Sequence, residues 1–165
     1  TKKNLLRVIE AFERFKETGK PHKLILAGID GFGFEKIGDA IAHSPYASDI
    51  VRFAYVSEKR KWQMLRYAEL FLFPSLWEGF GLPILEAQSV GTAVITSAVS
   101  SMPEVAGDGA VLVDPLDSVA IASAMTRLTD DSVLRHDIIE LGTANVKRFS
   151  WDSCARQTLQ IITSL

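Results

Sequence analysis

The sequence has little cysteine, no long apolar run and no excess of either charge. Cys154 is the one cysteine among 165 residues, so neither an internal disulfide nor a cysteine-based metal cluster is possible within the chain. No segment approaches the 18 consecutive apolar residues typical of a membrane-spanning helix. With 18 Lys and Arg against 20 Asp and Glu, the net charge is −2, which argues against a dedicated nucleic-acid-binding protein.

What is present is the composition of a globular domain, 47% hydrophobic and 23% charged. A chain of this size buries roughly 68–70% of its surface on folding, enough for a core without disulfides or a structural metal. The first residues, Thr1-Lys2-Lys3-Asn4, have neither an initiator methionine nor a signal-peptide pattern. We therefore expect the chain to be part of a longer protein.

Two hydrophobic patterns alternate along the first two thirds of the chain. Apolar residues recur at helical spacing from Leu5 to Phe15, and the run Lys23–Gly28 predicts a strand buried on both faces. Further helices are expected over 34–43, 58–68, 82–90 and 101–106, and further strands over 50–56, 70–73, 93–96 and 110–113. Strands that alternate with helices in this way predict an α/β fold, a Rossmann-like parallel sheet with helices on both faces.

After Asp117 the strand patterns stop. Three helices are expected at about 118–129, 131–148 and 151–164, with Asp117, Asp131 and Ser150 as their N-caps. No linker or repeat separates them from the sheet. We therefore treat residues 1–165 as one domain with 117–165 as its helical tail, although the tail could instead lie across a neighbouring domain.

The most informative segment is 74–86, which starts where an expected strand ends and finishes inside the next helix. Ligands of open α/β sheets bind at the carboxyl ends of the strands. Pro83 suits the start of a helix, where the missing N–H needs no partner. The sequence thus predicts that the amides of Phe80, Gly81, Leu82 and Ile84 are free to bind an anion, helped by the helix dipole.

Two carboxylates, Glu78 and Glu86, frame this turn eight residues apart. A carboxylate accepts hydrogen bonds from neighbouring hydroxyls, as on a ribose or a hexose. An anion site between two such groups matches a ligand with phosphates in the middle and a sugar at each end, which is a sugar nucleotide.

The motif "SLWEGFGLPILEA", followed by "GTAVITSAVSSMPEVAGDGAVLVDP", resembles the donor-binding C-terminal domain of the retaining GT-B glycosyltransferases, the GT4 or group 1 family. The resemblance extends over essentially the whole chain. It implies that Glu78 contacts hydroxyls of the donor sugar and that Glu86 holds the ribose. It also implies that the amides of Phe80, Gly81 and Leu82 cradle the sugar and phosphates.

The resemblance assigns Lys3 to the donor diphosphate, together with an arginine that the family places a few residues upstream. The first strand of the domain and the N-terminal acceptor-binding domain are likewise expected before residue 1. Without that strand the sheet should show a central gap with unpaired strand edges, unless another segment fills it. On this basis the isolated chain is expected to be inactive.

The resemblance further places the nucleobase beside Tyr55, Val56 and Ser57, and implies that neither a metal nor another cofactor is needed. Basic side chains and helix dipoles would stabilise the leaving diphosphate instead. The expected partners are a nucleoside-diphosphate sugar and, through the missing domain, an acceptor glycan, lipid or other hydroxyl compound. A cytoplasmic location is expected, with peripheral attachment to the membrane as an option.

Several alternatives stay open at this point. The chain could be a non-catalytic sugar-nucleotide-binding or interaction module, or a sugar-nucleotide epimerase on the same fold. The sugar, the base and the acceptor are not determined, with mannose favoured. The run 58–61 (EKRK) is expected to be a solvated helix start rather than a contact to a base or a membrane phosphate. Ser101 and Glu104 match a capping box.

Overall fold

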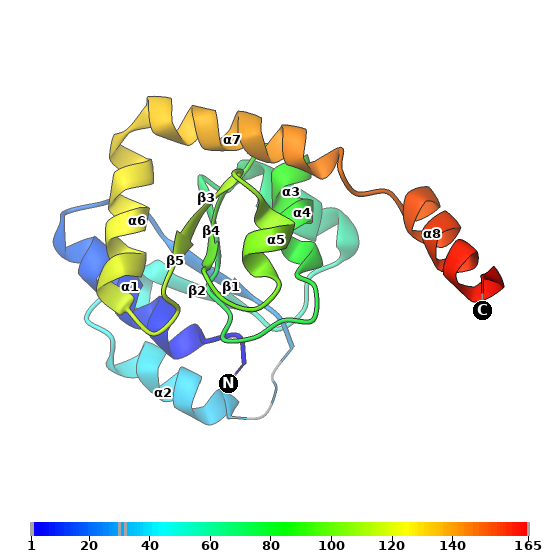
Figure 1. Ribbon diagram of the computed structural model, residues 1–165. Helices are drawn as coiled ribbons and strands as arrows, with labels where there is room; N and C mark the ends of the chain where they lie inside the picture. The colour runs from blue at the N-terminus through cyan, green and yellow to red at the C-terminus, as the bar shows by residue number, and fades with distance from the viewer. Residues whose placement is uncertain (1, 30, 32, 165) are drawn as a thin grey trace.

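The computed structural model describes residues 2–29, 31 and 33–164 and has the predicted α/β architecture (Figure 1). The parallel strands are β1 (Leu24–Ala27), β2 (Ile50–Phe53), β3 (Leu70–Phe73), β4 (Ala93–Ser97) and β5 (Ala110–Val113). The α-helices are α1 (Leu5–Glu17), α2 (Phe34–His43), α3 (Glu58–Tyr67), α4 (Leu82–Ser89), α5 (Met102–Ala106), α6 (Ser118–Asp130), α7 (Ser132–Val146) and α8 (Trp151–Thr163). A short 3₁₀ turn, Ala47–Asp49, precedes β2, which ends three residues earlier than expected.

Two apolar clusters lie on the two faces of the β3–β4–β5 sheet. One cluster joins that sheet to α1, α6, β1 and β2, and the other joins it to α3, α4 and α5. Ile95 of β4 belongs to the first cluster and Val94 to the second, because successive side chains of a strand point to opposite faces. All five residues of β4 are buried, as a strand covered on both sides requires.

The expectation that β1 is buried on both faces is wrong. Leu24 and Leu26 face the core, whereas Ile25 is 51% exposed. The apolar cluster that covers β1 contains Leu24 and Leu26 on one face of the strand, and Ile25 on the other face is left half exposed. A continuous apolar run in the sequence therefore overstated the burial of this strand.

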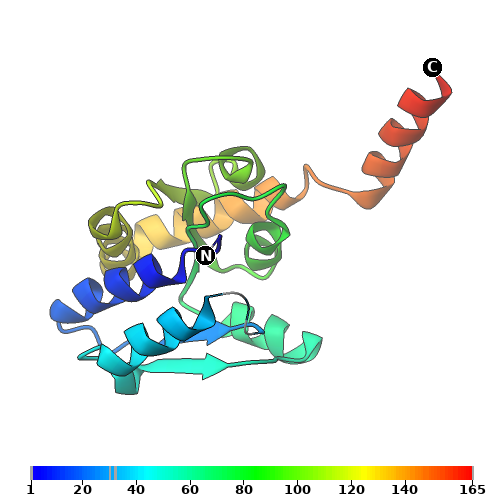
Figure 2. The ribbon, with the colours of Figure 1, turned by 90° about the horizontal axis from the view of Figure 1, so that it is seen from below.

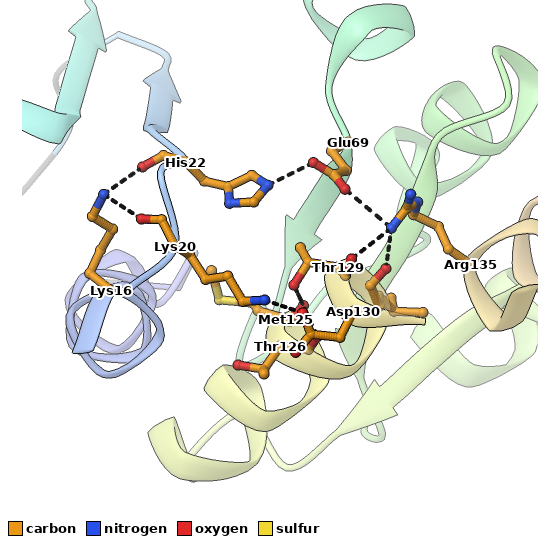
Figure 3. Close-up of polar contacts among 10 residues, drawn as sticks. Lys16, Lys20, His22, Glu69, Met125, Thr126, Thr129, Asp130 and Arg135 are labelled. Carbon is orange, nitrogen blue, oxygen red and sulfur yellow. Dashed lines mark hydrogen bonds and ion pairs between the residues drawn. The ribbon is translucent and has the colours of Figure 1, made fainter. Parts of the chain in front are cut away.

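The expected central gap is present. The strands form two separate sheets, β1–β2 and β3–β4–β5, and no ladder joins β1 to β3 among the described residues. Polar contacts span the gap at the amino ends of the strands (Figure 3), where His22 Nε2 lies 2.7 Å from Glu69 Oε2. Arg135 of α7 contacts the other oxygen of Glu69 at 3.1 Å, so three segments meet at this carboxylate.

A second group of contacts in the same region orders the loop between α1 and β1. Lys16 donates hydrogen bonds to the carbonyl oxygens of Lys20 and His22, at 2.7 and 3.2 Å (Figure 3). It also pairs with Asp49 at 2.8 Å. Lys20 also pairs with Asp130 at the end of α6. At the amino ends of the strands the two sheets are thus joined by side-chain hydrogen bonds and ion pairs rather than by strand pairing.

The three C-terminal helices begin where their predicted caps stand. The side chains of Asp117, Asp131 and Ser150 accept backbone hydrogen bonds in the first turns of α6, α7 and α8. Helices α6 and α7 pack on the body, against α1 and α4 respectively. Helix α8 instead stands off the body (Figures 1 and 2), and none of its residues is buried. No described helix has the length and apolar character needed to cross a bilayer.

Candidate functional site

The candidate site is built on the turn between β3 and α4, residues 74–81, at the carboxyl end of the sheet. Gly81 caps α4 with a φ of +108°, and a Cβ there would lie 3.2 Å from Ile84 Cδ1. Because side-chain-bearing residues rarely adopt this conformation, glycine is required at the point where the chain enters the helix. Pro83 follows in the first turn, as its sequence position predicts.

Of the four backbone amides expected to be free in this turn, one is already hydrogen-bonded. The amide of Ile84 donates to the carbonyl of Gly81 at 2.9 Å, so the prediction that it is free to bind a ligand is wrong. The first turn of α4 closes on itself and uses that donor. The amides of Phe80, Gly81 and Leu82 donate to no other described residue and remain available to an anion.

Lys3 and Glu78, 75 residues apart in sequence, meet at this turn. Lys3 Nζ lies 2.7 Å from Glu78 Oε1, and the glutamate side chain is 12% exposed. Burial raises the pKa of Glu78, but hydrogen bonding from Lys3 and Ser75 and the positive charges of Lys3 and Lys2 outweigh it, so the pKa lies below its ordinary value. The carboxyl is therefore ionised at neutral pH.

The residues that flank Lys3 fix it to the edge of the sheet. The carbonyl of Lys2 accepts a hydrogen bond from the amide of Leu76 at 2.9 Å. The side chain of Asn4 is buried and donates to the carbonyls of Pro74 and Pro115, at 3.0 and 2.6 Å. These bonds tie the start of α1 to the ends of β3 and β5, so the lysine stands directly over the turn.

Two serines that follow β4 hold the backbone of Glu78. The hydroxyl of Ser100 donates to the Glu78 carbonyl at 2.7 Å, and the Glu78 amide donates back to it at 3.3 Å. Ser101 Oγ lies 3.0 Å from the carbonyl of Glu78 and 2.8 Å from that of Phe80. The predicted capping box at Ser101 and Glu104 is wrong, because the hydroxyl is used by the turn and caps no amide of α5.

The roles of Ser100 and Ser101 are absent from the sequence-based prediction. Their sequence signal is slight: two adjacent serines directly after a strand whose carboxyl end borders the site. Ser100 also has a φ of +61°, unusual for a residue with a side chain. The turn that presents Glu78 is thus held from outside by a neighbouring loop.

Glu86 lies in α4 beyond the turn, and its partner is a lysine from α3. Lys61 Nζ is 3.0 Å from Glu86 Oε1. Val56 is half-buried in the loop that joins β2 to α3. The sequence predicts that the run 58–61 is a solvated helix start. Lys59 and Arg60 are indeed exposed, but the prediction is wrong for Lys61, because its ammonium pairs with Glu86.

Phe80 connects the turn to the C-terminal part of the chain. Its ring meets that of Phe149 edge-on, with centroids 5.8 Å apart and an interplanar angle of 89°. Phe149 lies in the linker between α7 and α8. The end of the compact body thus packs directly on the candidate site.

The arrangement offers a lysine beside a carboxylate, a row of unpaired amides and a second carboxylate in the helix behind. Such a set can bind an anion through the lysine and amides while the carboxylates accept hydrogen bonds from hydroxyl groups on either side. The described residues contain no group of three or more His, Cys, Asp or Glu side chains placed to hold a metal ion.

The chain is similar to three known glycosyltransferases or their structures in sequence or in fold. The chain is 34% identical to O-antigen chain mannosyltransferase B of Escherichia coli over 159 residues, 96% of this chain and 42% of that protein. It is 33% identical over 120 residues to D-inositol 3-phosphate glycosyltransferase of Streptomyces griseus, 71% of this chain and 25% of that one. The structure of HepE from Anabaena with UDP and glucose superposes with a TM-score of 0.87, at 20% identity, over 99% of this chain and 45% of HepE.

The chain therefore spans less than half the length of each of these proteins. The family model described as glycosyl transferases group 1 matches residues 1–144. That match covers both halves of the sheet, Lys3, and the turn with its two glutamates. On this evidence the chain belongs to the group 1 glycosyltransferase family.

Proposed function

We propose that this chain is the donor-binding domain of a glycosyltransferase that moves a sugar from a nucleoside diphosphate to an acceptor hydroxyl with retention of configuration. The observation that carries the proposal is the meeting of Lys3 and Glu78 over the turn at the carboxyl end of β3, with a row of unpaired amides beside them. Family membership and the nucleotide bound by HepE support the same class of ligand.

Each site residue then has a distinct role. Lys3 has three donors, so it can keep its bond to Glu78 and also bind the diphosphate. Glu78 accepts hydrogen bonds from the donor sugar, and the amides of Phe80, Gly81 and Leu82 hold the sugar and phosphates.

Glu86 accepts hydrogen bonds from the ribose, behind the turn. Val56 lies in the loop after β2, where the base would bind. These two residues therefore serve the nucleoside end of the donor, whereas the residues of the turn serve the sugar end.

During transfer the bond between the anomeric carbon and the diphosphate breaks, and the acceptor oxygen bonds to that carbon in its place. The proton of the acceptor hydroxyl passes to the departing diphosphate. Negative charge then collects on the diphosphate. Lys3 and the amides of the turn are positioned to stabilise that charge without reorganisation. We propose that no metal ion or other cofactor takes part, since these groups supply the positive potential.

Mannose is our proposed donor sugar, because a mannosyltransferase matches 96% of the chain. The acceptor would be a glycan, a lipid or another hydroxyl compound bound by the rest of the protein. Nucleotide sugars are made in the cytoplasm, so we propose a cytoplasmic site of action, with attachment to the membrane surface through the other domain.

The test uses the full-length protein and two glutamate variants. Donor binding is measured by calorimetry with UDP, GDP, UDP-glucose and GDP-mannose, and transfer by mass spectrometry of acceptor products. Glu86→Ala should weaken binding by about 10- to 100-fold, the equivalent of one hydrogen bond to a charged group. Glu104→Ala, which changes an exposed glutamate on α5, should leave it unchanged. Tight binding without any product would instead indicate a binding module, and conversion of the donor without an acceptor would indicate an epimerase.

A further inference from the structure

Lys61 joins the helix after the β2 loop to the helix that carries Glu86. Its ammonium lies 3.0 Å from Glu86 Oε1 and 2.9 Å from Glu58 Oε2. The side chains of Lys61 and Glu86 are each 29% exposed, so the pair is partly shielded from water. The lysine thus bridges two carboxylates from different helices.

The bridge fixes a carboxylate that would otherwise rotate. Hydrogen bonds to Glu58 and Glu86 raise the pKa of Lys61 above its ordinary value, so the lysine stays charged throughout the neutral range. One oxygen of Glu86 is held by the ammonium, and the other has no hydrogen-bond partner among the described residues. That oxygen is free to accept from a ligand hydroxyl in one defined orientation.

The same lysine connects Glu86 to the loop that contains Val56. Helix α3 starts at Glu58, and its N-cap Ser57, which accepts from the Arg60 amide at 3.3 Å, directly follows Val56. Lys61 stands one turn further along. The loop after β2 and the carboxylate on α4 are therefore linked by one short rigid helix and one ion pair.

We propose that Lys61 is a positioning residue for the donor: it holds the Glu86 carboxylate in the orientation that accepts hydrogen bonds from the ribose hydroxyls. It thereby sets the distance between the ribose-binding group and the loop after β2. The inference rests on the proposed donor site and adds a residue that touches Glu86 rather than the ligand.

A purely structural role for the ion pair makes a different prediction. If Lys61 only stabilised the packing of α3 on α4, its loss would weaken the binding of every nucleotide equally. If it acts through Glu86, its loss should matter only for ligands with ribose hydroxyls. Nucleotides that differ solely in those hydroxyls therefore separate the two explanations.

The experiment measures the affinity of the full-length protein for UDP and GDP, and for their 2′,3′-dideoxy counterparts, by calorimetry. Lys61→Met should weaken binding of the ribonucleotide by about fivefold, the upper range for a partly exposed pair. It should leave the dideoxy nucleotide within about twofold. Lys61→Arg should restore most of the affinity, and Lys59→Met, an exposed neighbour on the same turn, should change neither ligand.

A double variant adds a second readout. In the Glu86→Ala background, Lys61→Met should have no further effect, because the lysine acts through the missing carboxylate. Equal losses for both ligands, or no loss for either, would overturn the inference while the donor site stands. Absence of nucleotide binding by the wild-type protein would overturn the proposed function and this inference with it.

Discussion

Asn4 offers a sharp test of how the site is held, because its side chain joins three parts of the fold. It is 7% exposed, has a φ of +59° and donates to the carbonyls of Pro74 and Pro115. Each lost hydrogen bond costs about 0.5–1.5 kcal/mol. The left-handed backbone conformation also costs alanine about 1 kcal/mol, whereas asparagine adopts it more readily. Asn4→Ala should therefore lower the free energy of unfolding by about 2–4 kcal/mol.

Urea denaturation of the chain, followed by circular dichroism, measures this change. Asn4→Asp keeps the shape and the tolerance for a left-handed backbone but cannot donate, so it should cost at least about 1–3 kcal/mol. Thr18→Val removes a single hydroxyl bond at the other end of α1 and should cost about 1 kcal/mol or less. An Asn4→Asp variant as stable as the wild type would refute the reasoning, since the two hydrogen bonds donated by the Asn4 side chain would then contribute nothing to stability.

Three further predictions concern packing, the turn and pH. Gly142→Ala places a Cβ 2.9 Å from Cγ of the buried Gln88 and should lower the free energy of unfolding by about 1–3 kcal/mol in urea denaturation. Gly38→Ala in α2 is the control: its Cβ would meet no atom closer than 3.9 Å, so the variant should be as stable as the wild type or more stable. Ser101→Ala frees the turn and should weaken nucleotide binding by about fivefold in calorimetry, the equivalent of one hydrogen bond; unchanged affinity would contradict its role. The folded pKa of Glu78 lies below the unfolded value of about 4.3, so its pair with Lys3 stabilises the fold above that pH and ceases to do so as the pH falls through the folded pKa. Lys3→Met should thus cost up to about 1 kcal/mol at neutral pH and nothing once Glu78 is protonated, and an equal cost at both pH values in denaturation curves would contradict the pairing.

Local patterns predicted the elements of this fold well because their causes are local. Asp117 and Ser150 bond to amides two or three residues away, so their role as caps is visible in the sequence. The turn with Glu78 and Glu86 could also be located, because a strand end, glycines and a proline fall within a dozen residues.

The sequence could not show contacts between residues that are far apart along the chain. The sequence offers Ser101 a capping partner three residues later, Glu104. Its hydroxyl instead donates to carbonyl oxygens of the turn, more than 20 residues earlier. Lys61 looks like one of several solvated cations until α3 is packed beside α4. Ile25 looks buried because its neighbours are apolar, although burial depends on which helices lie above the strand.

The divided sheet has a consequence for how residues 1–165 open when they are studied without the rest of the protein. Since no ladder joins β1 to β3 among the described residues, β1 and β2 can separate from the rest without breaking a hydrogen bond within β3–β4–β5. Such an opening needs only the loss of side-chain contacts, including that between His22 and Glu69. In amide hydrogen exchange, the two halves should therefore behave as distinct cooperative units. Amides of β1 and β2 should exchange through a partial unfolding of lower free energy, and those of β4 only through global unfolding.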